Sequence, residues 1–231
     1  MVSIIIPKKR DEDISGLINS IIFSTYKDYE IIVVDEGLER SAQRNIGISR
    51  AKGEYLLILD SDQHPSPELI AECVHSMNWV DALYIPETIT TKGWFAKLRN
   101  WERQFYDGTS IDCVRFVRAK DCPPFDETMS GPEDSDWDRR VGGRRGVTRS
   151  RLYHQDNVGI VQYFKKKAYY AKSMGKFSYK NPDDEVTNFW WRCFGVFFEN
   201  GKWRGVVTAP HMFLAVMVLI FIRGVIYLWA K

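Results

Sequence analysis

The sequence lacks the short motifs that identify several large classes of enzyme. It contains no GxxxxGK[ST] phosphate-binding loop and no GxGxxG dinucleotide fingerprint, which argues against P-loop ATPases and NAD-dependent enzymes. Its four cysteines show neither CxxC nor CxxH spacing, so neither a zinc site nor a disulfide framework is expected. No basic segment precedes the apolar VSIIIP near the N-terminus, so no secretory signal is expected.

Acidic residues are almost absent from the segment 139–180. This segment holds twelve Lys and Arg residues and one acid, Asp156, a net charge of +11, whereas the rest of the chain carries 20 basic and 29 acidic residues, or −9. One strongly positive face suits phosphates or an anionic membrane surface. A solvated helical face is the simpler alternative. Nucleic-acid binding also fits basic and aromatic residues, but the apolar tail that follows favours a membrane, and no nucleic-acid partner is expected.

The longest apolar run lies at the C-terminus. Met212–Ala230 is 19 residues long and is interrupted by Arg223. As a helix it would measure roughly 28 Å at about 1.5 Å per residue, close to the thickness of a bilayer core. Lys202 and Arg204 precede the run and Lys231 follows it, which predicts a single-pass helix with the rest of the chain on the cytoplasmic side. A buried core helix or an oligomer-forming tail is the alternative.

Strand and helix signals alternate along the first hundred residues. Continuously apolar strands are predicted at VSIIIP (2–7), YEIIVVDEG (29–37), YLLIL (55–59) and DALYIPE (81–87), and helices at 13–26, 40–53 and 66–77. Asp13 is the predicted N-cap of the first helix and Gly53 the predicted C-cap of the second. Strands that are apolar on both faces belong to a parallel sheet covered by helices, so an α/β fold of the nucleotide-binding type is predicted.

Acidic residues follow two of these strands. Asp35 and Glu36 end one, and Asp60 and Asp62 come after another. Ligands of such sheets bind at the carboxyl ends of the strands. Grouped carboxylates repel one another, and a divalent cation such as Mg²⁺ or Mn²⁺ removes that cost. The Asp-x-Asp pattern therefore predicts a site for a metal ion and a diphosphate, with helix capping or a turn as an equally weighted alternative.

The densest acid cluster lies in PEDSDWDRR. A helix start needs only one or two of its four acids, Glu133, Asp134, Asp136 and Asp138, so the excess indicates a site where a carboxylate acts as a general base or orients a sugar. His154 follows and is either a metal ligand or an ordinary surface histidine. The basic and aromatic segment after it predicts helices lying in the headgroup plane of a membrane.

The order of these segments over residues 2–175 resembles the GT-A fold glycosyltransferases of family 2. The matching pieces are SIIIP, YEIIVVDEG, RNIGISRAKGEYLLILDSD and GPEDSDWDRR, followed by a histidine and a basic helix. The likeness is strongest to membrane-bound members, such as polyprenyl-phosphate mannose synthases and archaeal cellulose-synthase-like mannosyltransferases. It implies a GT-A, Rossmann-like catalytic domain over 1–158, amphipathic membrane-interface helices over 159–205 and a transmembrane helix over 206–231 at the cell membrane.

The resemblance also implies roles for individual residues. The nucleotide-sugar donor would bind at Pro7, Asp35, Arg44, Asp60 and Asp62. Mn²⁺ or Mg²⁺ would be held by Asp60, Asp62 and His154. Asp134, with Glu133 beside it, would be the general base, and Arg139 and Lys165 would contact the acceptor or its phosphate.

The reaction implied is inverting sugar transfer, with GDP-mannose the favoured donor, as in N-glycan biosynthesis. A hydroxyl acceptor needs a base whereas an ionised lipid phosphate does not, so Asp134 favours a hydroxyl of a lipid-linked glycan or glycolipid. Transfer to polyprenyl phosphate is the second possibility, and a non-catalytic sugar-nucleotide-binding membrane protein is the third. The Gln-x-x-Arg-Trp motif of processive synthases is only echoed by QYFKK, so polymer synthesis is not expected.

Overall fold

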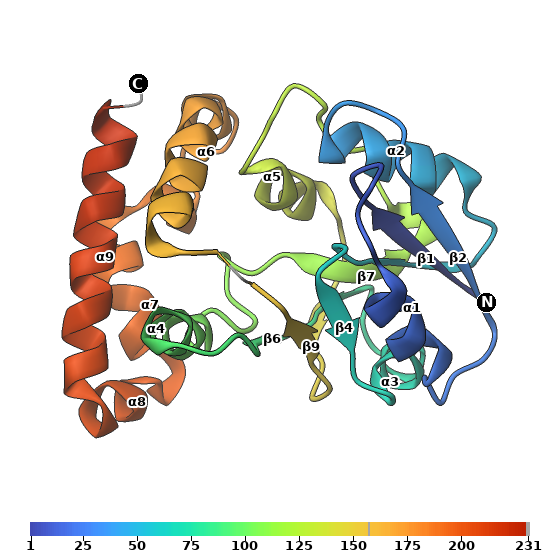
Figure 1. The fold of residues 1–231 in the computed structure, drawn as a ribbon, viewed down its shortest axis with the longest axis horizontal. Coiled ribbons are helices and arrows are strands. Elements are labelled where there is room, and N and C mark those ends of the chain that lie inside the picture. Colours follow the sequence, from blue (N-terminus) through green and yellow to red (C-terminus); the bar gives the residue numbers. More distant parts are fainter. Residues whose placement is uncertain (157, 230–231) are drawn as a thin grey trace.

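The computed structural model describes residues 1–156 and 158–229, as an α/β part with a group of helices packed beside it (Figure 1). The strands are β1 Val2–Pro7, β2 Tyr29–Val34, β3 Tyr55–Ile58, β4 Gln63–Pro65, β5 Ala82–Tyr84, β6 Glu87–Ile89, β7 Val114–Arg118, β8 Arg145–Val147 and β9 Leu152–His154. The helices are α1 Ser15–Ile22, α2 Arg40–Arg50, α3 Leu69–Ser76, α4 Trp94–Arg103, α5 Glu133–Arg140, α6 Ile160–Lys180, α7 Val196–Phe198, α8 Trp203–Thr208 and α9 Pro210–Trp229.

The main sheet has six strands in the order β2-β1-β3-β7-β5-β8. Strands β2, β1 and β3 are parallel, as their continuous apolar sequences predict. Strand β7 runs antiparallel to both β3 and β5, which makes the sheet mixed. The predicted α/β fold with helices on both faces of the sheet is confirmed, and β7 is an addition to the strands predicted above.

Alternate residues of β1 divide the sheet's two cores. Ile4 and Ile6 point to the face covered by α1 and α3, where they pack with Leu17 and Cys73. Ile5 points to the other face and packs with Trp137 of α5. This division follows from the two-residue period of a strand and explains why VSIIIP is apolar throughout.

Two predicted helix caps are wrong. Helix α2 ends at Arg50 with Ala51 as its C-cap, and Gly53 lies beyond it because the chain there passes close to β1. A Cβ atom on Gly53 would lie 2.6 Å from the backbone nitrogen of Ser3, so close approach and not capping requires glycine here. Helix α1 begins at Ser15 with Ile14 as its N-cap, although Asp13 Oδ1 accepts a hydrogen bond from the Ser15 backbone N–H at 2.8 Å.

A second, three-stranded sheet in the order β4-β9-β6 lies beyond the end of β3. Strand β9 pairs antiparallel with β4, which places His154 opposite Gln63. It pairs parallel with β6, which places Leu152 opposite Glu87. The short strands thus bring together residues that are 91 positions apart (Gln63 and His154) and 65 positions apart (Glu87 and Leu152), and they form one wall of the candidate site.

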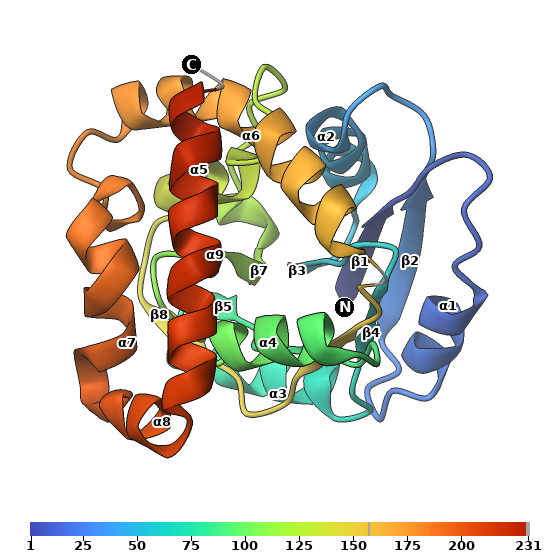
Figure 2. The ribbon, with the colours of Figure 1, turned by 60° about the vertical axis from the view of Figure 1, so that its left-hand side comes forward.

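The remaining helices share a third core. Leu98 and Phe105 from α4 and the segment after it pack with Phe197 of α7, Val206 of α8 and Leu219 of α9. Helix α9 runs along the side of this group, against α4 and α6 (Figures 1 and 2). It is the one described helix long and apolar enough to cross a membrane, with a mean hydropathy of 2.3, and 17% of its most apolar stretch is buried. It is therefore not a buried core helix. The end of the predicted span, Ala230 and Lys231, lies outside the described residues.

Candidate functional site

The register of the small sheet brings Asp62, His154 and Glu87 together. The His154 side chain lies between two carboxylates, with Nε2 3.0 Å from Asp62 Oδ2 and Nδ1 3.2 Å from Glu87 Oε2. Burial acts to lower the pKa of His154, but the hydrogen bonds to Asp62 and Glu87 outweigh it and raise the pKa to about 9. The imidazole is thus oriented from behind by a buried carboxylate and faces a partly exposed one, an arrangement that fixes which nitrogen is available to a ligand.

Glu87 is the centre of this wall and was missed by the sequence analysis. It accepts hydrogen bonds from Gln63 Nε2 at 2.9 Å and from Arg115 Nη2 at 2.8 Å, and it pairs with Arg103 Nη2 at 2.8 Å. Burial acts to raise the pKa of Glu87, but Arg103 and Arg115 hold it well below its usual range. The sequence does contain a pattern that could have predicted Glu87 as a site residue, because Glu87 follows the apolar segment DALYIP just as Asp60 follows YLLIL.

Arg44 joins the Asp-x-Asp loop to the acidic start of α5. Its guanidinium is buried, donates to Asp60 Oδ1 at 3.0 Å and forms a short ion pair with Asp134. Asp60 also lies 3.6 Å from Arg115. Burial acts to raise the pKa of Asp60, but the charges of Arg44 and Arg115 hold it well below its usual range. The carboxylate of Asp60 is therefore occupied by ion pairs with Arg44 and Arg115.

The four acids at the start of α5 divide into two pairs with different surroundings. Asp136 pairs with Arg140 at 2.9 Å, and Asp138 accepts from the Val114 N–H and pairs with Arg145 at 3.0 Å, so both hold the fold together. Glu133 and Asp134 instead line a cavity. Burial and the neighbouring charge of Asp134 raise the pKa of Glu133 to about 7. A carboxyl group with such a pKa suits general base catalysis near neutral pH.

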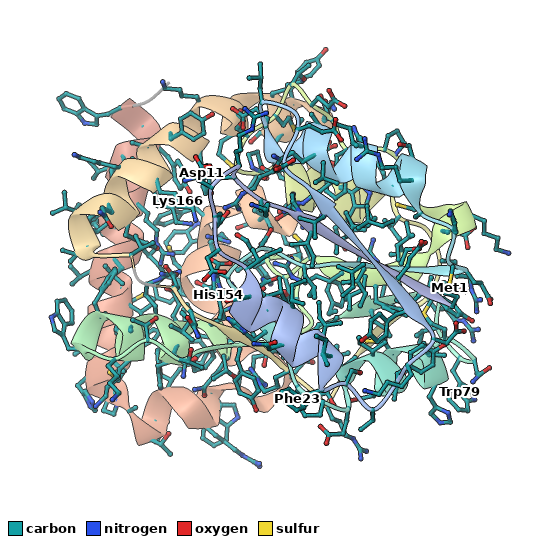
Figure 3. All side chains as sticks on the ribbon, turned by 45° about the vertical axis from the view of Figure 1, so that its right-hand side comes forward. Met1, Asp11, Phe23, Trp79, His154 and Lys166 are labelled. Carbon is teal, nitrogen blue, oxygen red and sulfur yellow. The ribbon has the colours of Figure 1, made fainter. Side chains whose placement is uncertain are left out.

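The cavity has a volume of about 240 Å³ and lies between α2, α4, α5, α6 and the small sheet. Carboxylates line it at Glu87, Asp112, Glu133, Asp134 and Asp156, and cations at Arg40, Arg99, Arg103, Arg115, Lys166 and Lys167. His154 is also in its wall, and Figure 3 shows His154 and Lys166 on the same side of the molecule. A second cavity of about 180 Å³ shares Arg40, Gly131, Glu133, Lys166 and Tyr170 with the first.

Three of the lining cations, Arg40, Lys166 and Lys167, have no carboxylate within ion-pair distance among residues 1–156 and 158–229. Lys166 and Lys167 instead lie over aromatic rings, with Lys167 Nζ 5.4 Å from the centre of Tyr163 and 5.8 Å from that of Tyr170. Burial and then the charges of Arg223, Arg192 and Arg99 lower the pKa of Lys167 to about 7. An anion entering the cavity would relieve this repulsion, so this end of the cavity suits a phosphate.

Other predicted site residues lie apart from the cavity lining. Arg139 points away, with Nε 2.6 Å from Asp184 Oδ2, and Lys165 is exposed on α6. The adjacent Lys166 and Lys167 face the cavity in their place, because a helix turns by about 100° per residue. Pro7 is buried at the end of β1, and Asp35 is exposed just after β2. These two flank the sheet edge where nucleotides bind in such folds.

The donor set for a divalent cation is small. Asp62 and His154 Nε2 are close enough to share an ion, whereas Asp60 is engaged by arginines. Among the described residues no group of three or more His, Cys, Asp or Glu side chains is arranged to hold a metal. Mg²⁺ and Mn²⁺ commonly take only one or two protein ligands and complete their shell with phosphate oxygens and water. Asp62 and His154 fit that pattern.

The chain was also compared with known proteins. Residues 36–125 match the family model "Glycosyl transferase family 2". The match contains the Asp-x-Asp loop, α2 and β7, and ends before α5. It covers less than half of the chain. No curated protein matches the sequence.

The fold is shared with S. aureus TarS. The crystal structure of TarS superposes with a TM-score of 0.54 at 15% identity, covering 89% of this chain and 45% of TarS, so the chain spans less than half of that protein. The TarS 1–349 fragment with UDP gives a TM-score of 0.55 at 14% identity, covering 99% of this chain and 88% of the fragment. The same fragment with UDP-GlcNAc gives 0.53 at 14%, covering 96% and 81%. At such low identity the likeness establishes the fold.

Proposed function

We propose that the chain is an inverting, metal-dependent glycosyltransferase that moves a sugar from a nucleoside diphosphate to a hydroxyl of a lipid-linked glycan or glycolipid. The observation that carries this proposal is the meeting of three groups at one cavity: the carboxylates Glu133 and Asp134, the imidazole of His154, and the unpaired lysines of α6. Asp62 is outside the cavity lining and reaches this group through its contact with His154 Nε2. The family 2 match over residues 36–125 and the fold shared with TarS support it.

The chain's own residues supply the proton transfer and the positioning. A carboxylate of α5 accepts the proton of the acceptor hydroxyl, and the oxygen forms a bond to the anomeric carbon as the bond to the diphosphate oxygen breaks. The electron pair of that bond leaves with the diphosphate, and displacement from the opposite side inverts the anomeric centre. A bound Mg²⁺ or Mn²⁺, held by Asp62 and His154, would stabilise the negative charge of the leaving diphosphate.

The choice of nucleotide-sugar donor rests only on resemblance to other glycosyltransferases. GDP-mannose is the first expectation from the resemblance to mannosyltransferases. TarS has been crystallised with UDP and UDP-GlcNAc, which makes UDP-sugars the second. Release of GDP or UDP from a panel of nucleotide sugars, with membranes and Mn²⁺ present, identifies the donor. Absence of turnover with every donor, while a nucleotide sugar still binds, would establish the non-catalytic alternative.

Variants of the site test the assignment. Asp62→Ala and Asp134→Ala should each abolish sugar transfer while the protein remains folded, because one removes a metal ligand and the other a carboxylate of the proposed base pair. Asp35→Ala, an exposed residue beside the nucleotide edge, should mainly weaken donor binding. Full activity in both Asp62→Ala and Asp134→Ala would refute the site.

Transfer to polyprenyl phosphate is a second candidate function, and the α6 lysines favour it. Lys166 and Lys167 line the cavity without a carboxylate partner among the described residues, as a phosphate acceptor would require. A phosphate acceptor needs no base, so Glu133→Gln would then retain activity whereas Lys167→Met would lose it. A hydroxyl acceptor predicts that at least one of Glu133→Gln and Asp134→Asn is inactive, whereas a phosphate acceptor leaves both active.

A further inference from the structure

Helix α9 has two faces of different character. Leu214, Val218, Phe221, Val225 and Leu228 are exposed, and Phe221 keeps 72% of its surface accessible. Their spacing of three or four residues places all five on one side of a helix that turns about 100° per residue. The buried residues Val216, Leu219 and Arg223 fall on the opposite side. An apolar stripe therefore runs along the outer side of the helix, from its first turns to its last.

The inner side of α9 contacts a charged residue of α4 and packs against the lysine-rich helix α6. Arg223 is buried and forms an ion pair with Glu102 of α4, whose carboxylate also accepts from the Tyr106 hydroxyl. Helix α6 packs along α9 as well, and it contains six lysines and no acid. Figures 1 and 2 show α9 passing beside both helices, with α4 running across it and α6 oblique to it.

We infer that α9 lies in the plane of a membrane surface, with its outer stripe in the lipid, and does not cross the bilayer. Crossing while still packed would carry the lysines of α6 into the hydrocarbon core, where charged groups are costly. Crossing alone would separate Arg223 from Glu102 and leave buried charges without partners. An in-plane position avoids both costs, because only the outer stripe meets the lipid.

The surroundings of the stripe suit an anionic lipid surface. Residues 189–229 contain a single acid, Glu199, alongside Arg192, Lys202 and Arg204. Trp190, Trp203 and Trp229 are exposed in the same region, and such aromatic side chains favour the headgroup level of a bilayer. The net positive charge of this segment adds attraction to negatively charged lipids.

The topology of the full chain tests the inference. In bacteria, a green fluorescent protein fused after Lys231 should fluoresce and alkaline phosphatase fused there should be inactive, with the same results for fusions before Met1. Both ends would then lie on the cytoplasmic side. A dark fluorescent protein and an active phosphatase at the C-terminus alone would overturn the inference, since α9 would then cross the membrane.

Vesicle flotation tests the stripe itself. The purified chain should float with vesicles of phosphatidylcholine and phosphatidylserine, and Phe221→Glu should weaken this binding by about tenfold, the loss expected when one large apolar side chain no longer enters lipid. Trp79→Glu is the matched control, because Trp79 is also exposed and lies far from α9 (Figure 3). It should float like the original chain. Leu214→Glu repeats the test in another turn of α9 if Phe221→Glu does not fold.

Two results would overturn the role of the stripe. One is equal flotation of Phe221→Glu, Leu214→Glu and the original chain. The other is a stable dimer that does not bind vesicles, since a second copy would then cover the stripe. Neither sugar donor nor acceptor is present in the flotation assay. Failure of the membrane inference is therefore distinguishable from failure of the proposed glycosyltransferase function. The membrane inference rests on that proposed function only for its choice of a membrane as the surface that α9 contacts.

Discussion

Nη2 of Arg44 lies 3.0 Å from Oδ1 of Asp60, and the same guanidinium reaches Asp134 on α5. One buried cation therefore connects the loop after β3 to the helix that carries the proposed base. The two aspartates of the Asp-x-Asp loop thus have different partners. Asp60 pairs with arginines, whereas Asp62 lies beside His154. Several measurable consequences depend on this difference.

Replacing Arg44 should destabilise the fold. Arg44→Met leaves the mostly buried Asp60 and the neighbouring Asp134 without a cation that both share, and breaking a buried pair in this way costs about 3–5 kcal/mol of unfolding free energy. Arg50→Met is the matched control on the same helix, because its pair with Glu36 is exposed and should change stability by less than about 0.5 kcal/mol. Chemical denaturation measures both. Equal stability of the two variants would show that Arg44 is not structural.

The rate of sugar transfer should rise as the pH increases through about 7. The pKa of Glu133 is raised to about 7, and a base works only in its deprotonated form, so acid conditions switch it off. Glu133→Gln should remove this dependence together with most of the activity. Asp136→Asn on the same helix should retain the pH profile, because Asp136 is paired with Arg140. An unchanged midpoint in Glu133→Gln would assign the base to Asp134.

Metal binding should tighten as the pH rises toward 9. With its pKa raised to about 9, His154 carries a proton at neutral pH, and a metal ion must displace that proton from Nε2. Mg²⁺ affinity in the presence of UDP or GDP should therefore increase by about tenfold per pH unit below about 9. Calorimetry in buffers of different ionisation enthalpy measures the released proton. His154→Gln should abolish the release and His75→Gln, an exposed control, should not. An affinity for Mg²⁺ that does not change with pH would exclude His154 as a metal ligand.

Two glycines should respond to alanine in opposite directions. Gly53→Ala places a Cβ 2.6 Å from the backbone nitrogen of Ser3, which cannot move aside as a side chain could, so we expect a loss of about 1–3 kcal/mol. Gly175 lies inside α6 with no atom within 4 Å of such a Cβ, and Gly175→Ala should gain up to about 1 kcal/mol from helix propensity. Thermal unfolding of both variants checks the pair, and the same sign for both would contradict it.

Much of the fold could be predicted because local sequence specifies it. The strand VSIIIP has the predicted bounds, Val2–Pro7, since both of its faces are buried and its residues are apolar throughout. Strand β7 was harder to predict, because two of its five residues are arginines whose partners come from other parts of the chain: Arg115 pairs with Glu87 and Asp60, and Arg118 with Glu54. Its direction depends on pairing between β3 and β5, which a local pattern does not specify.

The candidate site was predictable only in outline. Acids at strand ends indicated Asp60 and Asp62, and the excess of acids in α5 indicated Glu133 and Asp134. Which acids of α5 would face the cavity depends on how that helix lies against β7 and α6, as does the choice between Lys165 and its neighbours. The central position of Glu87 depends on the register of β6 against β9, which is a tertiary property.

The pair between Arg223 and Glu102 has a practical consequence for anyone who produces this protein. Deleting a hydrophobic C-terminal helix is a common way to obtain soluble protein. Here such a truncation would leave Glu102 without its partner Arg223 in an apolar interior and expose Leu98 and Phe105, which pack in the same group of helices as the cavity-lining Arg99 and Arg103. Detergent or lipid nanodiscs around the intact polypeptide are therefore the appropriate starting point for its biochemistry.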